Sequence, residues 1–177
     1  LRATGTALAA GRRRRAGARE AAMNDAIALD TAFARAFERG EVGNDSFRHR
    51  EHLRLAWACL AEGPSTEAAC ARVGAAIRAF ARRAGSAQRY HETLTQFWVR
   101  LLAGVQAGVR AAACDAIGLD AVLAAHPWLL DKDLPLAYYT RALLFGDAAR
   151  AAWRPPDLRP LPSHAPAADP RAPPRHA

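Results

Sequence analysis

The apolar residues of this 177-residue chain recur at helical spacings from residue 23 to residue 153, and this pattern constrains the fold more than any other feature. Within residues 66–84, for example, Val73, Ile77 and Phe80 follow one another at intervals of four and three, which places them on one helix face. No stretch shows the alternation of apolar and polar residues that a half-buried strand requires. The chain is therefore predicted to be all-α.

Glycine, proline and capping residues divide this pattern into separate helices. Four main helices are expected at about residues 24–39, from a cap within 44–46 to residue 61, at 66–84 and at 87–109. Gly118, Pro127 and Pro135 divide the remainder into shorter C-terminal helices. Because the loops are short, we expect a single-domain antiparallel helical bundle formed by residues 23–153.

The basic charge of the chain is concentrated at its ends. The formal charge is +8, yet residues 23–153 contribute only +1, whereas residues 1–22 contribute +5 from six Arg and one Glu. Residues 1–22 lack aromatic side chains and have only two large apolar ones, both Leu, so we expect a disordered, Arg-rich extension. Met23 is the only methionine, and the extension is interpreted as upstream read-through. A nucleic-acid-binding arm is the alternative.

The C-terminal segment, residues 154–177, carries a charge of +2 and eight of the eleven prolines. This composition is typical of an extended Pro-rich tail, and we expect most of it to be disordered. Leu158 and Leu161 are the apolar residues by which its first part, residues 154–162, can pack on the domain.

Several functional classes have no support in the sequence. It contains no P-loop, no G-x-G-x-x-G and no G-x-S-x-G motif, and no run of about 18 apolar residues that predicts a membrane span. Cys59, Cys70 and Cys114 form neither a disulfide framework nor a C-x-x-C pair, which is typical of a cytoplasmic protein. The core has no stripe of basic residues with interleaved aromatics, so we do not expect nucleic acid as a partner.

Three histidines fall on helix faces that are otherwise apolar. On the second helix, His49 and His52 share the face of Leu53 and Trp57. On the fourth helix, His91 lies near the centre of the face that continues with Leu94, Trp98 and Leu101. Because a buried imidazole needs partners for its ring nitrogens, these three residues are predicted to meet at one site between two helices.

One hypothesis for this site is a metal centre. Neutral imidazole is a common ligand of transition metals, so His49, His52 and His91 could bind a divalent ion such as Zn or Fe. Glu92 could then act as a base or orient bound water. This hypothesis leaves open whether the protein is an enzyme.

Two other interpretations use the same residues. The histidines could line a pocket for an unidentified small molecule, with Trp57, Tyr90, Trp98 and Tyr139 as further ligand-binding residues. Alternatively, the protein is a structural or interaction module in which the histidines only satisfy the core, each by a bond to a backbone carbonyl or a carboxylate.

Two segments carry a resemblance to a known family. Phe47-Arg48-His49-Arg50-Glu51-His52-Leu53 and Tyr90-His91-Glu92-Thr93 resemble the F-x-H-x-x-H-L and Y-H-E-T motifs of an uncharacterised family of small bacterial all-helical proteins. The resemblance covers roughly residues 24–162. It implies that His49, His52, His91 and Glu92 belong to one recurring site, and it implies no established activity.

Overall fold

The structure, a computed structural model, describes residues 3–111, 117–163, 169 and 171, and their regular structure is entirely helical, which confirms the all-α prediction. The α-helices of these residues are α1 (Ala3–Glu38), α2 (His49–Glu62), α3 (Thr66–Arg83), α4 (Glu92–Ala111), α5 (Leu119–Ala125), α6 (Arg141–Leu144) and α7 (Asp147–Ala151). Short 3-10 helices occur at Asn44–Ser46, Ala87–Arg89, Pro127–Leu130 and Leu134–Ala137.

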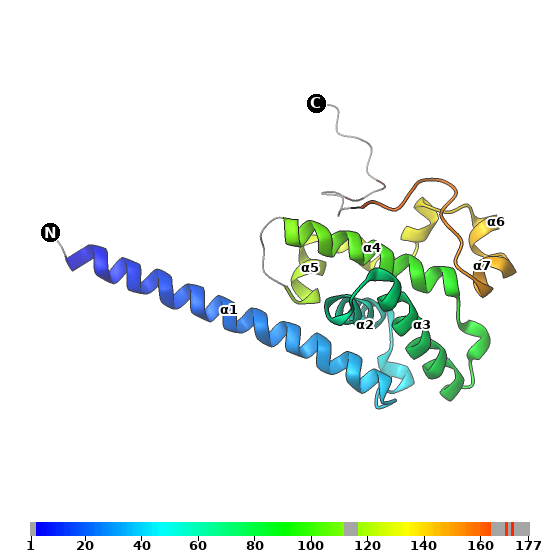
Figure 1. Cartoon of the computed structure of the whole chain (residues 1–177), viewed down its shortest axis with the longest axis horizontal. Helices are drawn as coiled ribbons and strands as arrows, with labels where there is room; N and C mark the ends of the chain where they lie inside the picture. The colour runs from blue at the N-terminus through cyan, green and yellow to red at the C-terminus, as the bar shows by residue number, and fades with distance from the viewer. Residues whose placement is uncertain (1–2, 112–116, 164–168, 170, 172–177) are drawn as a thin grey trace, which may run out of the picture.

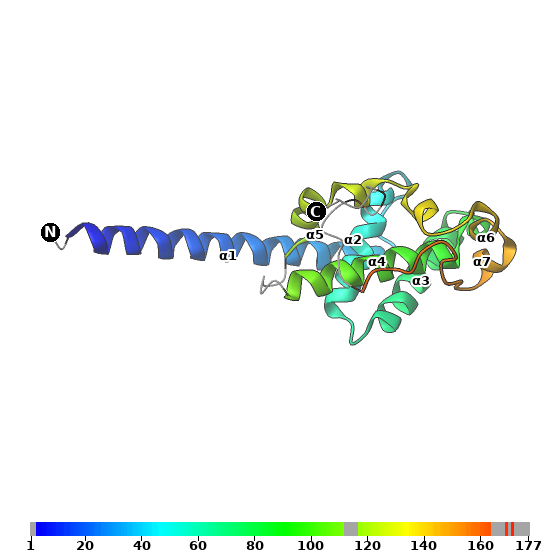
Figure 2. The ribbon, with the colours of Figure 1, turned by 90° about the horizontal axis from the view of Figure 1, so that it is seen from above.

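Helix α2 lies at the centre of the bundle. It contacts α1, α3, α4 and α5, and both views of the ribbon show it enclosed by its neighbours (Figure 1, Figure 2). Residues 55–60 are consecutively buried, because a helix with neighbours on several sides must be apolar around most of its circumference. His49 and His52 lie in the first turn of α2, before this buried run, and both are half-buried.

Helix α1 is longer than expected. The predicted helix at residues 24–39 is present, but α1 begins at Ala3, so the expectation that residues 1–22 are disordered is wrong for residues 3–22. Alanine and arginine have high helix propensities, and extending an existing helix has no nucleation cost. Residues 17–22 contribute nothing to the core, since they are exposed, and this half of α1 projects from the bundle (Figure 1).

The boundaries of α3 agree with the predicted ones, whereas the starts of α2 and α4 differ. Ser65 caps α3 by accepting a hydrogen bond from Ala68 N–H at 3.1 Å. The expected caps of α2 at 44–46 form a separate 3-10 turn, and α2 starts at His49, where Glu51 accepts the backbone N–H of Arg48 at 3.1 Å.

Helix α4 begins at Glu92, five residues after its predicted start at residue 87. Residues 87–89 form their own 3-10 turn, and Tyr90 has an extended backbone with φ −64° and ψ 143°. An extended residue cannot continue a helix, so it separates the turn from α4. His91 consequently precedes the helix instead of lying one turn inside it.

The segment after α7 packs on the domain, as predicted for residues 154–162. Leu158 N–H donates to Tyr138 O at 2.9 Å, and Asp157 accepts hydrogen bonds from both the N–H and the hydroxyl of Thr140. Leu161 packs against the core, whereas Leu158 is 55% exposed, so backbone bonds hold this residue instead of apolar contact. Disorder is predicted for residues 163–177, and all of these except residues 163, 169 and 171 lie outside the described residues.

In the part of the chain that the structure describes, none of the helices combines the length and apolarity needed to traverse a lipid bilayer.

Candidate functional site

A cavity of about 400 Å³ lies between α2, α3 and α4. Its lining residues come from the start of α2, from α3, from the connection between α3 and α4, from the first turns of α4 and from one position after α5: Phe47, Arg48, His49, His52, Ile77, Arg89, Tyr90, His91, Leu94, Thr95, Trp98 and Lys132. The cavity thus has His49, His52 and His91 in its wall, together with two of the four predicted ligand-binding residues, Tyr90 and Trp98. We call it the histidine cavity.

Both ring nitrogens of His91 are engaged by the protein. Its Nε2–H donates to Leu144 O at 2.8 Å, and its Nδ1 accepts the backbone N–H of Leu94 at 3.2 Å. The second bond places the imidazole as an N-cap of α4, three residues before the N–H that it satisfies. With 6% of its surface exposed, His91 is a buried residue whose hydrogen bonds are complete within the fold.

His49 uses only one of its ring nitrogens. Nε2 lies 2.9 Å from Leu129 O, and because a carbonyl can only accept, Nε2 carries the proton. Nδ1 therefore has a lone pair, and it has no hydrogen-bond partner among the described residues. The edge of the ring packs against Trp98, with ring centroids 4.6 Å apart, which fixes the imidazole in the cavity wall.

His52 shows the opposite tautomer. Its Nδ1 lies 2.7 Å from Arg48 O, so Nδ1 carries the proton and Nε2 has the lone pair. As for His49, no described residue donates to that second nitrogen. Phe47 holds the ring from one side at a centroid distance of 3.9 Å. The start of α2 therefore contributes two hydrogen-bond acceptors to residues that line the cavity.

The three imidazoles are neutral at physiological pH. Burial lowers the pKa of His49, of His52 and of His91, and in each case it outweighs the hydrogen bond to a backbone carbonyl, which raises the pKa. Lys132 lowers the pKa of His49 further, and His49 lowers that of His52. The lone pairs on His49 and His52 are consequently available above mildly acidic pH.

Glu92, the predicted base, does not line the cavity. Its carboxylate accepts hydrogen bonds from Arg78 at 2.7 Å, from the Tyr90 hydroxyl at 2.8 Å and from Gln96 at 2.8 Å. Burial raises the pKa of Glu92, but these hydrogen bonds and the Arg78 charge lower it below its ordinary value. A carboxylate held in this way is a weak base, and the structure gives it the role of fixing Tyr90 in the cavity wall.

Trp57 and Tyr139, the other predicted ligand-binding residues, lie elsewhere. Trp57 donates its Nε1–H to Ile117 O at 3.0 Å and lines a smaller cavity of about 110 Å³ beside Asp30. Tyr139 is 1% exposed and donates to Arg154 O at 2.9 Å. Both side chains hold segments of the chain together, and neither lines the histidine cavity.

The described residues contain no group of three or more His, Cys, Asp or Glu side chains arranged to hold a metal ion. The bonds of His91 explain this result, since neither of its nitrogens has a lone pair left for a ligand bond. Cys59 and Cys70 are buried, and burial raises the pKa of each thiol to about 11, which disfavours the thiolate that a metal requires. Cys114 lies outside the described residues.

Sequence reasoning missed the cationic side chains of the cavity. Arg48, Arg89 and Lys132 line it, and none of them was singled out from the sequence. Each of them lies in an irregular segment, where helical periodicity does not predict which way a side chain points, so the sequence gives little indication of their place in the cavity. Lys132 is nevertheless unusual, since it is the only lysine among 25 basic residues.

Comparison of the chain with protein-family models, with curated proteins and with solved structures finds no match. The resemblance to a bacterial helical family, based on the two histidine motifs, stays a prediction.

Proposed function

We propose that the protein binds a small molecule in the histidine cavity, with His49 Nδ1 and His52 Nε2 accepting hydrogen bonds from the ligand. The observation that carries this proposal is the pair of imidazole lone pairs without a partner in the described chain, on two residues that line one cavity. Neither nitrogen is among the buried side-chain atoms without a partner in the described residues, so both are accessible to solvent and a ligand in the cavity can donate to them.

The remaining wall indicates the body of the ligand. Phe47, Ile77, Leu94 and Trp98 supply apolar surface, and a cavity of about 400 Å³ falls within the range of about 300–1,000 Å³ that is usual for ligand pockets. An apolar wall with a few directed polar groups binds a ring system that carries hydroxyl or N–H donors. The proposed ligand is therefore an aromatic or alicyclic molecule with at least one hydrogen-bond donor.

The alternative interpretation, a structural module, is supported by His91 alone. That residue is fully bonded within the protein, as the alternative requires of all three histidines. The same hydrogen-bond pattern argues against a three-histidine metal centre, so we do not propose one. His49 and His52 favour the binding proposal over the structural one, because each has one ring nitrogen without a partner in the described residues.

The test compares two matched probes by protein-observed NMR titration. 2-Naphthol carries a hydroxyl donor, whereas 2-methoxynaphthalene has the same rings and no donor. We expect 2-naphthol to bind about fivefold more tightly, which corresponds to one hydrogen bond of about 1 kcal/mol. We expect this preference to disappear in the double variant His49→Leu, His52→Leu.

The control variant is His126→Leu, because His126 lies outside the cavity and packs against Trp128. It should keep the preference for 2-naphthol. The proposal is wrong if neither probe shifts resonances of cavity residues, or if the double variant retains the full preference.

A further inference from the structure

We infer that the ligand of the histidine cavity is an organic anion, a ring system that carries a carboxylate or phosphate group. This inference rests on the proposed function and adds the charge of the ligand to it. It is carried by the basic side chains that sit in the cavity lining without acidic partners.

In the part of the chain that the structure describes, three cationic side chains line the cavity and no acidic one does. They come from separate segments: Arg48 directly precedes α2, Arg89 ends the 3-10 turn before α4, and Lys132 lies between two 3-10 helices near the C-terminus. All three are exposed, which places their charges at the mouth of the cavity and leaves the apolar and histidine side chains for its interior. Charges of one sign that converge on a concave site concentrate ligands of the opposite sign.

None of these cations is neutralised by an acid in residues 3–111, 117–163, 169 or 171. Arg48 Nε donates only to a backbone oxygen, that of Asp45, at 3.2 Å. Elsewhere on the bundle, partly buried arginines do find carboxylates, as Arg72 does with Glu38 at 2.6 Å and Arg54 with Asp30 at 3.0 Å. Arg82, Arg83 and Arg110 are likewise without an acidic partner among the described residues, so Arg48, Arg89 and Lys132 are distinguished by lining one cavity and not by being unpaired.

The acidic residues close to the cavity already have hydrogen-bond or ion-pair partners in the protein. Glu51 and Asp131 raise the pKa of His49, yet neither lines the cavity. Asp131 is paired with Arg171, and Glu51 accepts the backbone N–H of Arg48. Glu92 is paired with Arg78. Among the described residues, the cavity lining therefore carries three cationic side chains and no acidic one, which favours a ligand with an anionic group.

A second cavity extends the site beyond His52. It measures about 280 Å³ and shares Phe47, His52, Ile77, Arg89 and Tyr90 with the first. Its further lining includes the polar residues Asn44 and Ser86. Arg89 lines both cavities, so a single guanidinium can reach an anionic group whichever of the two the ring body occupies. The site accordingly accommodates a molecule larger than one ring.

The experiment uses probes that share their rings and hydroxyl donor and differ chiefly in charge. 6-Hydroxy-2-naphthoate and 6-hydroxy-2-naphthamide share rings and hydroxyl donor, and only the first is anionic; 6-hydroxy-2-naphthyl phosphate provides the phosphate arm. Affinities are measured by isothermal titration calorimetry on the full chain. We expect an anionic probe to bind about tenfold more tightly than the amide at low salt, with a smaller advantage at high salt because mobile ions screen exposed charges.

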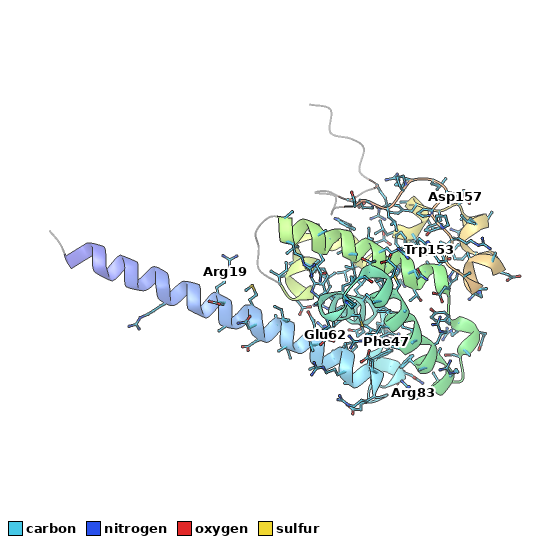
Figure 3. The ribbon with its side chains drawn as sticks, viewed as in Figure 1. Arg19, Phe47, Glu62, Arg83, Trp153 and Asp157 are labelled. Carbon is cyan, nitrogen blue, oxygen red and sulfur yellow. The ribbon has the colours of Figure 1, made fainter. Side chains whose placement is uncertain are left out.

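Two variants locate the charge effect. Lys132→Gln and Arg89→Gln should each weaken binding of the anionic probe about three- to fivefold and leave the amide unchanged. Arg19→Gln removes the same charge from the projecting part of α1, far from Phe47 in the cavity wall, and should change neither affinity (Figure 3). Which anionic probe binds more tightly identifies the carboxylate or the phosphate as the preferred group.

The outcomes separate this inference from the proposed function. If the amide binds as tightly as both anions and keeps its dependence on His49 and His52, the anion inference is wrong and the proposed function stands. If none of the three probes binds, the proposed function fails and the inference fails with it. Equal weakening of anion and amide by Lys132→Gln also overturns the inference, because the effect is then not one of charge.

Discussion

The two walls of the histidine cavity contain the same residue type and differ in how their polar atoms are bonded. On the α4 side, His91 bonds Leu144 and Leu94 through its two nitrogens, and Glu92 ties Tyr90 to Arg78. On the α2 side, His49 and His52 each bond one carbonyl and keep one lone pair. The α4 wall is therefore part of the support of the fold, and the α2 wall has capacity left for a ligand.

The largest expected effect is that of His91→Ala. The substitution leaves the N–H of Leu94 and the carbonyl of Leu144 without their partner, and each unsatisfied buried group costs about 1–3 kcal/mol. We expect the free energy of unfolding to fall by about 3 kcal/mol in urea titrations. His91→Asn should recover about 1 kcal/mol, because asparagine is a good N-cap and can still accept from Leu94. A loss below about 1 kcal/mol for His91→Ala would contradict the supporting role of the α4 wall.

An intermediate effect is expected for Glu92→Gln. The substitution keeps a hydrogen-bonding side chain but removes the ion pair with Arg78, which is 41% exposed, so the loss at neutral pH should be about 1 kcal/mol. Because the folded-state pKa of Glu92 lies below its ordinary 4.5, the stabilisation is fully present above pH 4.5 and is lost as the pH falls through the folded value. Urea titrations of both proteins across acidic pH should show their stabilities converging, and a constant difference would show that the ion pair is not the cause.

The smallest effect should come from the α2 wall. His52→Leu removes the side-chain donor to Arg48 O, but that carbonyl still accepts the backbone N–H of His52 at 3.1 Å. No buried group loses its only partner, so we expect the free energy of unfolding to change by less than about 0.5 kcal/mol. The measurement is the same urea titration. A loss as large as that of His91→Ala would remove the distinction between the walls and favour the structural interpretation.

Periodicity in the sequence was sufficient to predict the fold class and the interior. The α3 boundaries and its Ser65 cap were predictable because a clear capping residue and a glycine flank an uninterrupted amphipathic pattern. The burial of Tyr138 and Tyr139 was harder to predict. Both are buried, because neighbouring residues of a short irregular segment can both turn inward. Residues 3–22 are helical because of the local helix propensity of their Ala and Arg residues. This propensity does not require large apolar side chains that pack on the core.

The sequence predicted one site for eight residues, and the structure brings five of them to one cavity: His49, His52, Tyr90, His91 and Trp98. The sequence did not predict their hydrogen bonds. A helical wheel correctly predicted that His91 is buried, yet it assumed a helix through residue 91, whereas α4 begins one residue later. That single residue turns a helix-face side chain into a cap. The bonds of His49 and His91 depend on carbonyls 80 and 53 residues away, and no local pattern contains that information.

Helix α1 has a consequence for how the protein moves in solution. Its 36 residues extend for roughly 54 Å, whereas a compact domain of some 140 residues, with a radius of gyration of about 14 Å, is only about 36 Å across. A body with such a rod attached rotates more slowly about its short axes than about its long one. Small-angle scattering should therefore give a distance distribution with an extended tail, and nitrogen relaxation rates should vary with the orientation of each N–H bond relative to α1.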